Sequence, residues 1–148
     1  MAEMSYKEEF IKIYKDNIKR RGADSVLAWL EDSDFFTAPA STRFHLANFY
    51  KKDYRNVKNS EGVWEKAPYY TVEDTLPYGH GEKSAILLLQ LGLTLSTEEL
   101  VAIRWHMGGF DDAVKGGSYA MSTAYEKYPL AVLLNIADMK ATYLDEVN

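Results

Sequence analysis

Residues 79–92 read Gly-His-Gly-Glu-Lys-Ser-Ala-Ile-Leu-Leu-Leu-Gln-Leu-Gly, and residues 104–110 read Arg-Trp-His-Met-Gly-Gly-Phe. The apolar run 84–91 predicts a helix that is buried on most sides and ends at a glycine. Ser96 with Glu99 forms a capping-box pattern that begins the next helix, which is expected to end near His106. His80 and His106 therefore lie beside glycine at helix ends, a position from which a side chain can project into a cleft.

The chain on either side continues the helical pattern. Apolar residues at helical spacing predict a helix over 5–21 that stops at Gly22, followed by a shorter helix capped by Asp24. Residues 118–128 are weakly helical, and Pro129 suits the first turn of a last helix. The inner stripe of that last helix is expected to contain Leu130, Leu133, Leu134, Ala137 and Ala141.

Two segments are expected to interrupt the helices. Residues 50–57 and 63–72 are rich in aromatic and β-branched residues, and the short loop between them contains Gly62, which predicts a β-hairpin. Residues 111–117 predict a loop with two acidic residues and a glycine pair. A chain of 148 residues without a visible linker or repeat fits a single domain, 1–148. The predicted class is all-α with one inserted hairpin.

Composition narrows the choice of partners. The net charge is -5, so the chain has no global basic field, and nucleic acid is not an expected partner. Cysteine is absent, which excludes disulfides, thiolate metal sites and cysteine nucleophiles. The N-terminus is polar and no apolar run approaches the length of a membrane span, so we expect a cytoplasmic protein with no membrane partner. One basic cluster is interpreted as a solvated hairpin face rather than a local nucleic-acid patch: Lys51, Lys52, Arg55, Lys58 and Lys66.

A set of sulfur-free ligands is present. Asp138 falls on the apolar stripe of the last helix, where a carboxylate must be paired, hydrogen-bonded or bound to a metal. With His80, His106 and His45 it suits a divalent ion, and these residue types do not distinguish Mn, Fe, Co, Ni, Zn and Mg. His45 also reads as a polar residue between aromatics. Such a metal polarises a phosphoryl oxygen and activates water.

Two cations flank the histidines in sequence. Lys83 follows His80 by one helical turn, and Arg104 precedes His106 by two residues, so both are candidate phosphate contacts. Each reads equally well as an exposed surface cation. Glu82 is better explained by the dipole of a helix N-terminus than by acid–base catalysis. The sequence contains no nucleophile elbow, Walker-type loop, His-Glu-x-x-His pair or dinucleotide fingerprint.

Four segments carry a family resemblance. Residues 35–45, 76–84 and 102–111 and the pair Ala137-Asp138 resemble a bacterial and phage branch of the HD-domain superfamily of metal-dependent phosphohydrolases. The resemblance covers nearly the whole chain. It implies a shortened HD-domain-like helical bundle, one or two divalent metals, and hydrolysis of nucleotides or other small phosphate esters. By position, Asp138 matches the late Asp of the family, and His80 and His106 match the histidines that bind a second metal.

The chain departs from the family pattern at its defining motif. No His-Asp doublet is present, because His45 precedes Leu46, His80 precedes Gly81 and His106 precedes Met107. The helices that would carry the first His and the doublet are absent between Phe44-His45 and Ala47-Asn48.

Three interpretations follow from this departure. The chain is a phosphohydrolase with a reduced metal site, an inactive HD-like module that binds a nucleotide or a protein partner, or a shortened chain without activity of its own. Missing core helices would leave apolar faces uncovered, so a homodimer is also expected.

Overall fold

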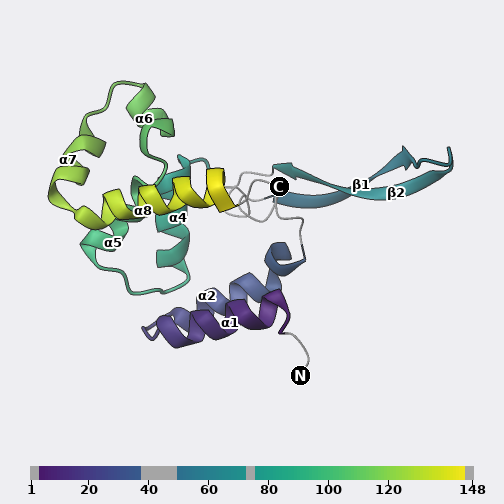
Figure 1. Ribbon diagram of the computed structural model, residues 1–148, viewed down its shortest axis with the longest axis horizontal. Coiled ribbons are helices and arrows are strands. Elements are labelled where there is room, and N and C mark those ends of the chain that lie inside the picture. Colours follow the sequence, from purple (N-terminus) through teal and green to yellow (C-terminus); the bar gives the residue numbers. More distant parts are fainter. Residues whose placement is uncertain (1–3, 38–49, 73–75, 146–148) are drawn as a thin grey trace.

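The computed structural model describes residues 4–37, 50–72 and 76–145, and these residues are mostly helical with one two-stranded antiparallel hairpin (Figure 1). The predicted class and the inserted hairpin are confirmed at that level, whereas His45 lies outside the described residues. No helix in these three ranges is both long and apolar enough to cross a bilayer. The elements are α1 (Tyr6–Asn17), α2 (Ala23–Asp32), η1 (Asp34–Phe36), β1 (Tyr50–Lys58), β2 (Trp64–Val72), α4 (His80–Gln90), α5 (Thr97–Arg104), η3 (Gly108–Phe110), α6 (Asp112–Lys115), α7 (Ala120–Lys127), α8 (Pro129–Lys140) and η4 (Ala141–Asp145).

Helix termini follow local capping chemistry. The backbone N–H of Glu8 donates to the Ser5 hydroxyl, and the Glu8 carboxylate accepts from the Ser5 backbone, which begins α1 at Tyr6. Ser96 and Glu99 make the predicted capping box at the start of α5, and Pro129 opens α8 as expected. The prediction that Asp24 caps α2 is wrong, because Gly22 occupies the cap position with a φ of +89°.

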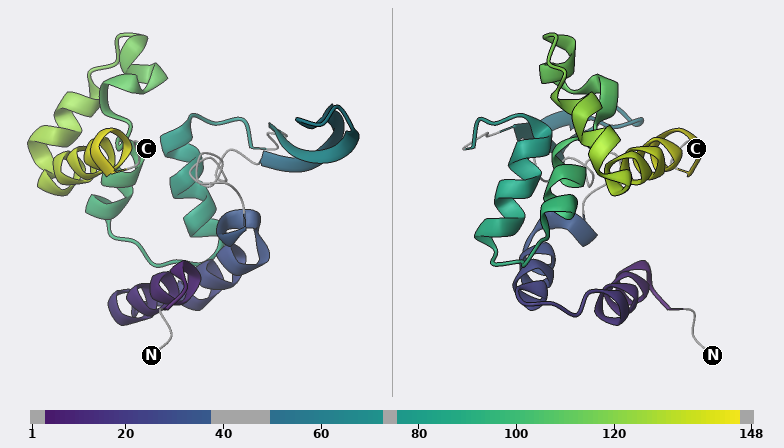
Figure 2. Two further views of the ribbon diagram at one scale, coloured as in Figure 1. Left: turned by 45° about the vertical axis from the view of Figure 1, so that its right-hand side comes forward. Right: turned by 90° about the vertical axis from the view of Figure 1, so that its left-hand side faces the viewer.

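The α1–α2 pair packs on the turn between α4 and α5 (Figure 2). Tyr14, Val26, Leu27 and Leu93 are buried in this contact. The Thr94 backbone N–H donates to the Arg21 carbonyl at 3.0 Å, and Tyr14 Oη donates to the Ala23 carbonyl at 2.7 Å. The pair is therefore attached through these buried side chains and through the loop that joins its two helices.

An ion pair reinforces this attachment. Arg20 Nη1 lies 2.7 Å from Glu99 Oε2, and the same nitrogen donates to the Thr94 carbonyl at 3.1 Å. The hydrogen bond from Arg20 is the main cause that lowers the pKa of Glu99 to about 2, and the Ser96 backbone N–H adds to it. Glu99 thus serves both the start of α5 and the junction with α1–α2.

Two predictions of burial are wrong. The apolar run of α4 is not buried on most sides, since Leu89 is 48% exposed. In α8, Leu133 is 62% exposed and Ala137 is exposed, whereas Ala131 is fully buried. A helix that is apolar nearly all round has no periodic pattern of polar residues, so its sequence does not indicate which face packs against neighbouring helices.

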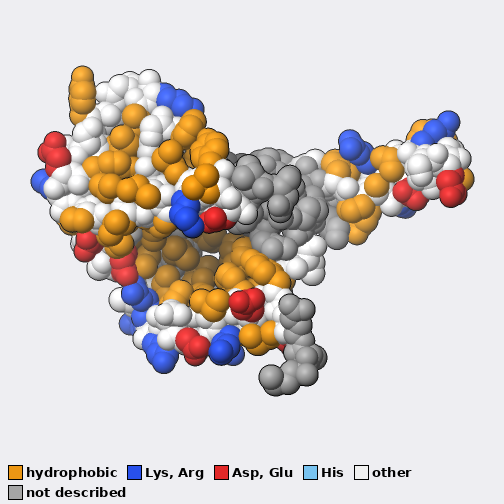
Figure 3. All heavy atoms as spheres, in the orientation of Figure 1, with side chains coloured by type: hydrophobic (Ala, Val, Ile, Leu, Met, Phe, Trp, Pro, Cys, Tyr) orange, Lys and Arg blue, Asp and Glu red, His pale blue; other side chains and the backbone are white. Residues whose placement is uncertain are grey.

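The core is thin for the size of the chain. The accessible surface is 10260 Å², against about 7,700 Å² expected for a compact monomer of 16.9 kDa. An open apolar hollow of about 430 Å³ lies between the α1–α2 pair and the helices α4, α5 and α8 (Figure 3). Its wall includes Ile18, Leu88, Leu93, Ile103, Leu130 and Leu134.

The Arg20–Glu99 pair predicts a pH-dependent stability. Because folding lowers the pKa of Glu99 from 4.5 to about 2, its contribution is present above pH 4.5 and is lost as the pH falls toward 2. Glu99→Gln should lower the free energy of unfolding by about 0.5–1 kcal/mol near neutral pH, the range for a partly exposed pair. Urea unfolding should show this difference vanish near pH 2. Glu98→Gln, at an exposed position of the same helix, is the control. A difference for Glu99→Gln that stays constant with pH would contradict the assignment.

Candidate functional site

His80 and His106 lie side by side. His80 is the first residue of α4, and His106 follows the last turn of α5. Their ring centroids are 5.0 Å apart, with an angle of 59° between the ring planes. The structure therefore brings together the two histidines that their placement at helix ends had singled out.

Gly81 permits this approach. It is buried in the first turn of α4, and a Cβ built on it would overlap the backbone carbonyl of Arg104 in α5. The two backbones consequently touch beside His80. Glycine at this position is explained by close helix packing, in addition to its place near a helix terminus.

The end of α5 fixes the orientation of His106. Its Nδ1 lies 2.5 Å from the Ile103 carbonyl, which can only accept a hydrogen bond, so Nδ1–H is the donor and Nε2 is the ring nitrogen that this contact leaves for a ligand. Asn135 Nδ2 donates to the His106 carbonyl at 2.8 Å, and Tyr125 Oη donates to the Trp105 carbonyl at 3.3 Å. Side chains of α7 and α8 thereby satisfy backbone carbonyls that follow the helix.

The paired histidines line a cavity of about 530 Å³. Asp138 of α8 lines the same cavity, so three of the four predicted ligands line one cavity. Within the described residues, however, no group of three His, Asp or Glu side chains is close enough to hold a metal ion. The other lining residues are Met107, Phe110, Lys115, Asn135, Met139, Thr142 and Tyr143.

Arg104 is held by two carboxylates. Its Nη2 lies 2.7 Å from Glu82 Oε1, and its Nη1 lies 2.7 Å from Asp111 Oδ2. The guanidinium also lies 3.8 Å from the centroid of the Trp105 ring. A phosphate that bound Arg104 would have to compete with both carboxylates. The predicted phosphate contact at Arg104 would therefore require these ion pairs to be weakened or broken.

Asp111 is the residue beside this site that sequence reasoning missed. It is buried, and it caps α6 by accepting the backbone N–H of Ala113 at 2.9 Å while it pairs with Arg104. The predicted loop over 111–117 contains the short helix α6 for this reason. An Asp immediately before a potential first turn was the available signal, but its pairing with Arg104 depends on tertiary structure.

Lys83 is buried, with 3% of its surface exposed. The interpretation as an exposed lysine is therefore wrong. Lys83 is not among the residues that line the histidine cavity, whereas Lys115 of α6 is. Lys115 is largely exposed and lies 3.8 Å from Asp112 Oδ1. Lys115 is thus the better-placed cation for an anionic group in that cavity.

The close contact at Gly81 predicts a strong effect of adding one methyl group. Gly81→Ala should destabilise the protein by about 1–3 kcal/mol, because its Cβ would displace the Arg104 backbone. Gly109→Ala is the matched control, since a Cβ there meets no atom within 4 Å. Urea unfolding of both variants measures the difference. Equal unfolding midpoints for the two variants would show that the contact between Gly81 and the Arg104 backbone has room for a methyl group.

Comparison with known proteins assigns no family to this chain. No protein-family model matches the chain, and neither a curated protein nor a solved structure matches it. The HD-type resemblance therefore stays a prediction.

Proposed function

We propose that the chain is an HD-type, metal-dependent phosphohydrolase with a reduced metal site formed by His80 and His106. The observation that carries this proposal is the pairing of their rings, 5.0 Å apart, on the wall of a cavity that Asp138 also lines. The substrate class is a small phosphate ester such as a nucleotide. This class follows from the resemblance and is consistent with a cavity of about 530 Å³.

The two imidazoles are suitable ligands for a divalent ion, although within the described residues they do not form a three-ligand group with Asp138. Neutral imidazole binds most first-row divalent metals, and His106 donates Nδ1–H to a backbone carbonyl, the arrangement common for metal-binding histidines. When bound, the metal would polarise a phosphoryl oxygen and lower the pKa of a coordinated water. Lys115, on the same wall, supplies a positive charge for the phosphate.

A second candidate function is binding without hydrolysis. The observation that favours it is the pairing of Arg104 with Glu82 and Asp111, which neutralises a cation that phosphate transfer would otherwise use. The missing His-Asp doublet points the same way. In this alternative the cavity holds a nucleotide, or the chain binds a protein partner, and no bond is broken.

Metal-dependent stabilisation tests the proposed site. Adding Mn²⁺, Ni²⁺ or Co²⁺ should raise the melting temperature of the wild-type protein, because a ligand that binds only the folded state stabilises it. His80→Ala and His106→Ala should each abolish that increase while the far-UV circular dichroism stays unchanged. Thr142→Ala, which alters the same wall without removing an imidazole, should retain it.

The two functions are separated by turnover. Hydrolysis of a generic phosphomonoester or of a nucleotide in the presence of one of these ions, lost in both histidine variants, supports the enzyme. Stabilisation by nucleotides without metal and without turnover supports the binding module. Unfolding of both histidine variants in the absence of metal would instead make the ring pair a packing feature.

We also propose that the chain forms a homodimer through the outer face of α8 and η4. Leu133 is 62% exposed, Ile136 56% and Leu144 72%, and their spacing places apolar side chains along one side of the helix. Apolar faces of this kind are commonly covered by a second copy.

Multi-angle light scattering should give a dimer for the wild type and a monomer for Leu133→Glu. Tyr119→Glu, at a position that is 85% exposed in another part of the surface, is the control and should remain dimeric. A wild-type monomer at all concentrations would reject the interface.

A further inference from the structure

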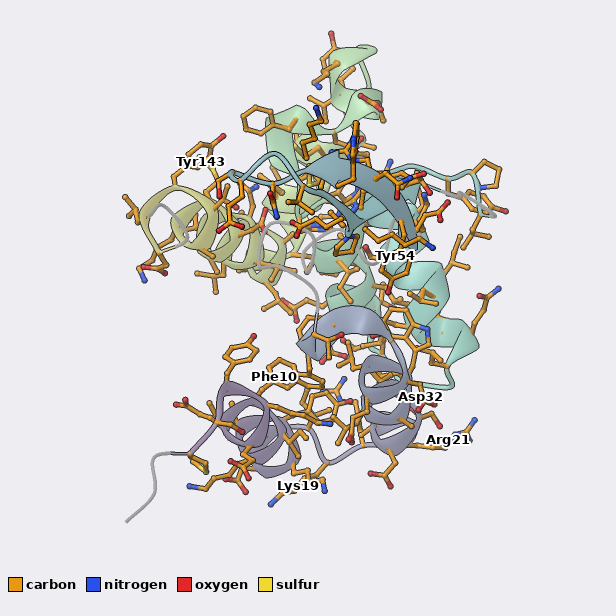
Figure 4. The ribbon with its side chains drawn as sticks, turned by 90° about the vertical axis from the view of Figure 1, so that its right-hand side faces the viewer. Phe10, Lys19, Arg21, Asp32, Tyr54 and Tyr143 are labelled. Atoms are coloured by element: carbon orange, nitrogen blue, oxygen red, sulfur yellow. The ribbon has the colours of Figure 1, made fainter. Side chains whose placement is uncertain are left out.

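The hairpin of β1 and β2 projects away from the helices (Figure 1), and Figure 4 labels its Tyr54 in a view from the hairpin side. Its strands pair antiparallel, with Tyr54 opposite Pro68, Asn56 opposite Lys66 and Lys58 opposite Trp64. A two-stranded hairpin alone is marginally stable in water. The side chains on its two faces therefore indicate what the hairpin could contact.

The register sorts the central side chains onto two faces. Alternate residues of a strand, and residues directly opposite each other, share a face. One face, which we name the aromatic–lysine face, carries only exposed residues and no acid: Tyr54, Asn56, Lys58, Trp64, Lys66 and Pro68. Trp64 is 66% exposed and Tyr54 56%.

The opposite face differs in burial and in charge. Val57, Ala67 and Tyr69 are half-buried there. Its two acids, Asp53 and Glu65, accompany Arg55, whose guanidinium lies 5.4 Å from the Tyr69 ring centroid. The acidic residues of the central strands therefore all lie on the face away from Trp64 and Lys66.

The turn holds Trp64 in place. Asn59 Oδ1 accepts the backbone N–H groups of Glu61 and Val63, each at 3.0 Å, which orders the loop immediately before Trp64. Lys58 Nζ lies 5.3 Å from the Trp64 ring centroid. An ammonium group and an indole ring are thus presented together at the tip of the hairpin.

We propose that the aromatic–lysine face binds single-stranded nucleic acid without sequence preference. Bases stack on Trp64 and Tyr54, while Lys58 and Lys66 contact phosphates. Between residues 50 and 72 the sequence has five Lys or Arg and three Asp or Glu, although the whole chain has a net charge of -5. The hairpin segment therefore has a net positive charge, which complements an anion, although the whole chain is negative.

A membrane surface is the competing anionic partner. Elements that lie on membranes separate an apolar side from a charged side. Here Lys58 lies directly opposite Trp64, and Tyr54 and Lys66 are on the same face. Stacking combined with phosphate contact needs rings and lysines on one face, and this arrangement favours nucleic acid.

Fluorescence anisotropy with a labelled oligothymidylate at low salt tests the proposal on the full chain. Trp64→Ala should weaken binding about tenfold, while Trp64→Phe should retain most of the affinity because a ring remains. Lys66→Ala should weaken binding and reduce the slope of log K against log salt by about 0.7. Arg55→Ala removes one cation from the opposite face and should change the affinity by less than about twofold.

Four outcomes would overturn the proposal. The first is no anisotropy change for the wild type at low salt. The second is an equal loss of affinity for Arg55→Ala and Lys66→Ala, and the third is no loss for Trp64→Ala, each with unchanged circular dichroism. The fourth is flotation with phosphatidylserine-containing vesicles but no oligonucleotide binding, which would assign the face to a membrane surface. None of these readouts depends on metal binding or phosphate-ester turnover.

Discussion

The backbone contact between Gly81 and the carbonyl of Arg104 is the constraint on which the described site depends. Any larger residue at 81 would move the start of α4 away from the end of α5, and His80 away from His106. The same crossing brings Arg104 between Glu82, on the first turn of α4, and Asp111, which begins α6. Glycine at position 81 therefore permits both the histidine pair and the ion pairs of Arg104 beside it.

The rest of the molecule is loosely packed by comparison. The α1–α2 pair contacts the remainder through its loop, near Gly22 and Leu93, and leaves an open apolar hollow beside it. Within the described residues, no large side chain is less than 2% exposed. A homodimer on α8 would cover one of the exposed apolar surfaces.

Features with local causes were predictable from the sequence. The hairpin follows from two segments rich in aromatic and β-branched residues on either side of a short loop with Gly62, and the start of α5 follows from Ser96 and Glu99. Features set by tertiary contact were not. The exposed side of Leu133, the burial of Lys83 and the role of Asp111 depend on which helix crosses which. The histidine pair was predictable in part. The sequence indicated that His80 and His106 each lie at a helix end, but it did not indicate that these two helix ends meet.

Pro68 in the middle of β2 has a consequence for how the chain behaves in concentrated solution. Both strands of a two-stranded sheet are edges, and open edges invite pairing with other chains. Proline has no N–H group, so it is tolerated only where no further strand needs that donor. Intermolecular sheet growth along β2 therefore meets a gap in the hydrogen-bond ladder. Pro68 therefore disfavours the addition of a further strand to β2, on a hairpin whose exposed side chains include Tyr54 and Trp64.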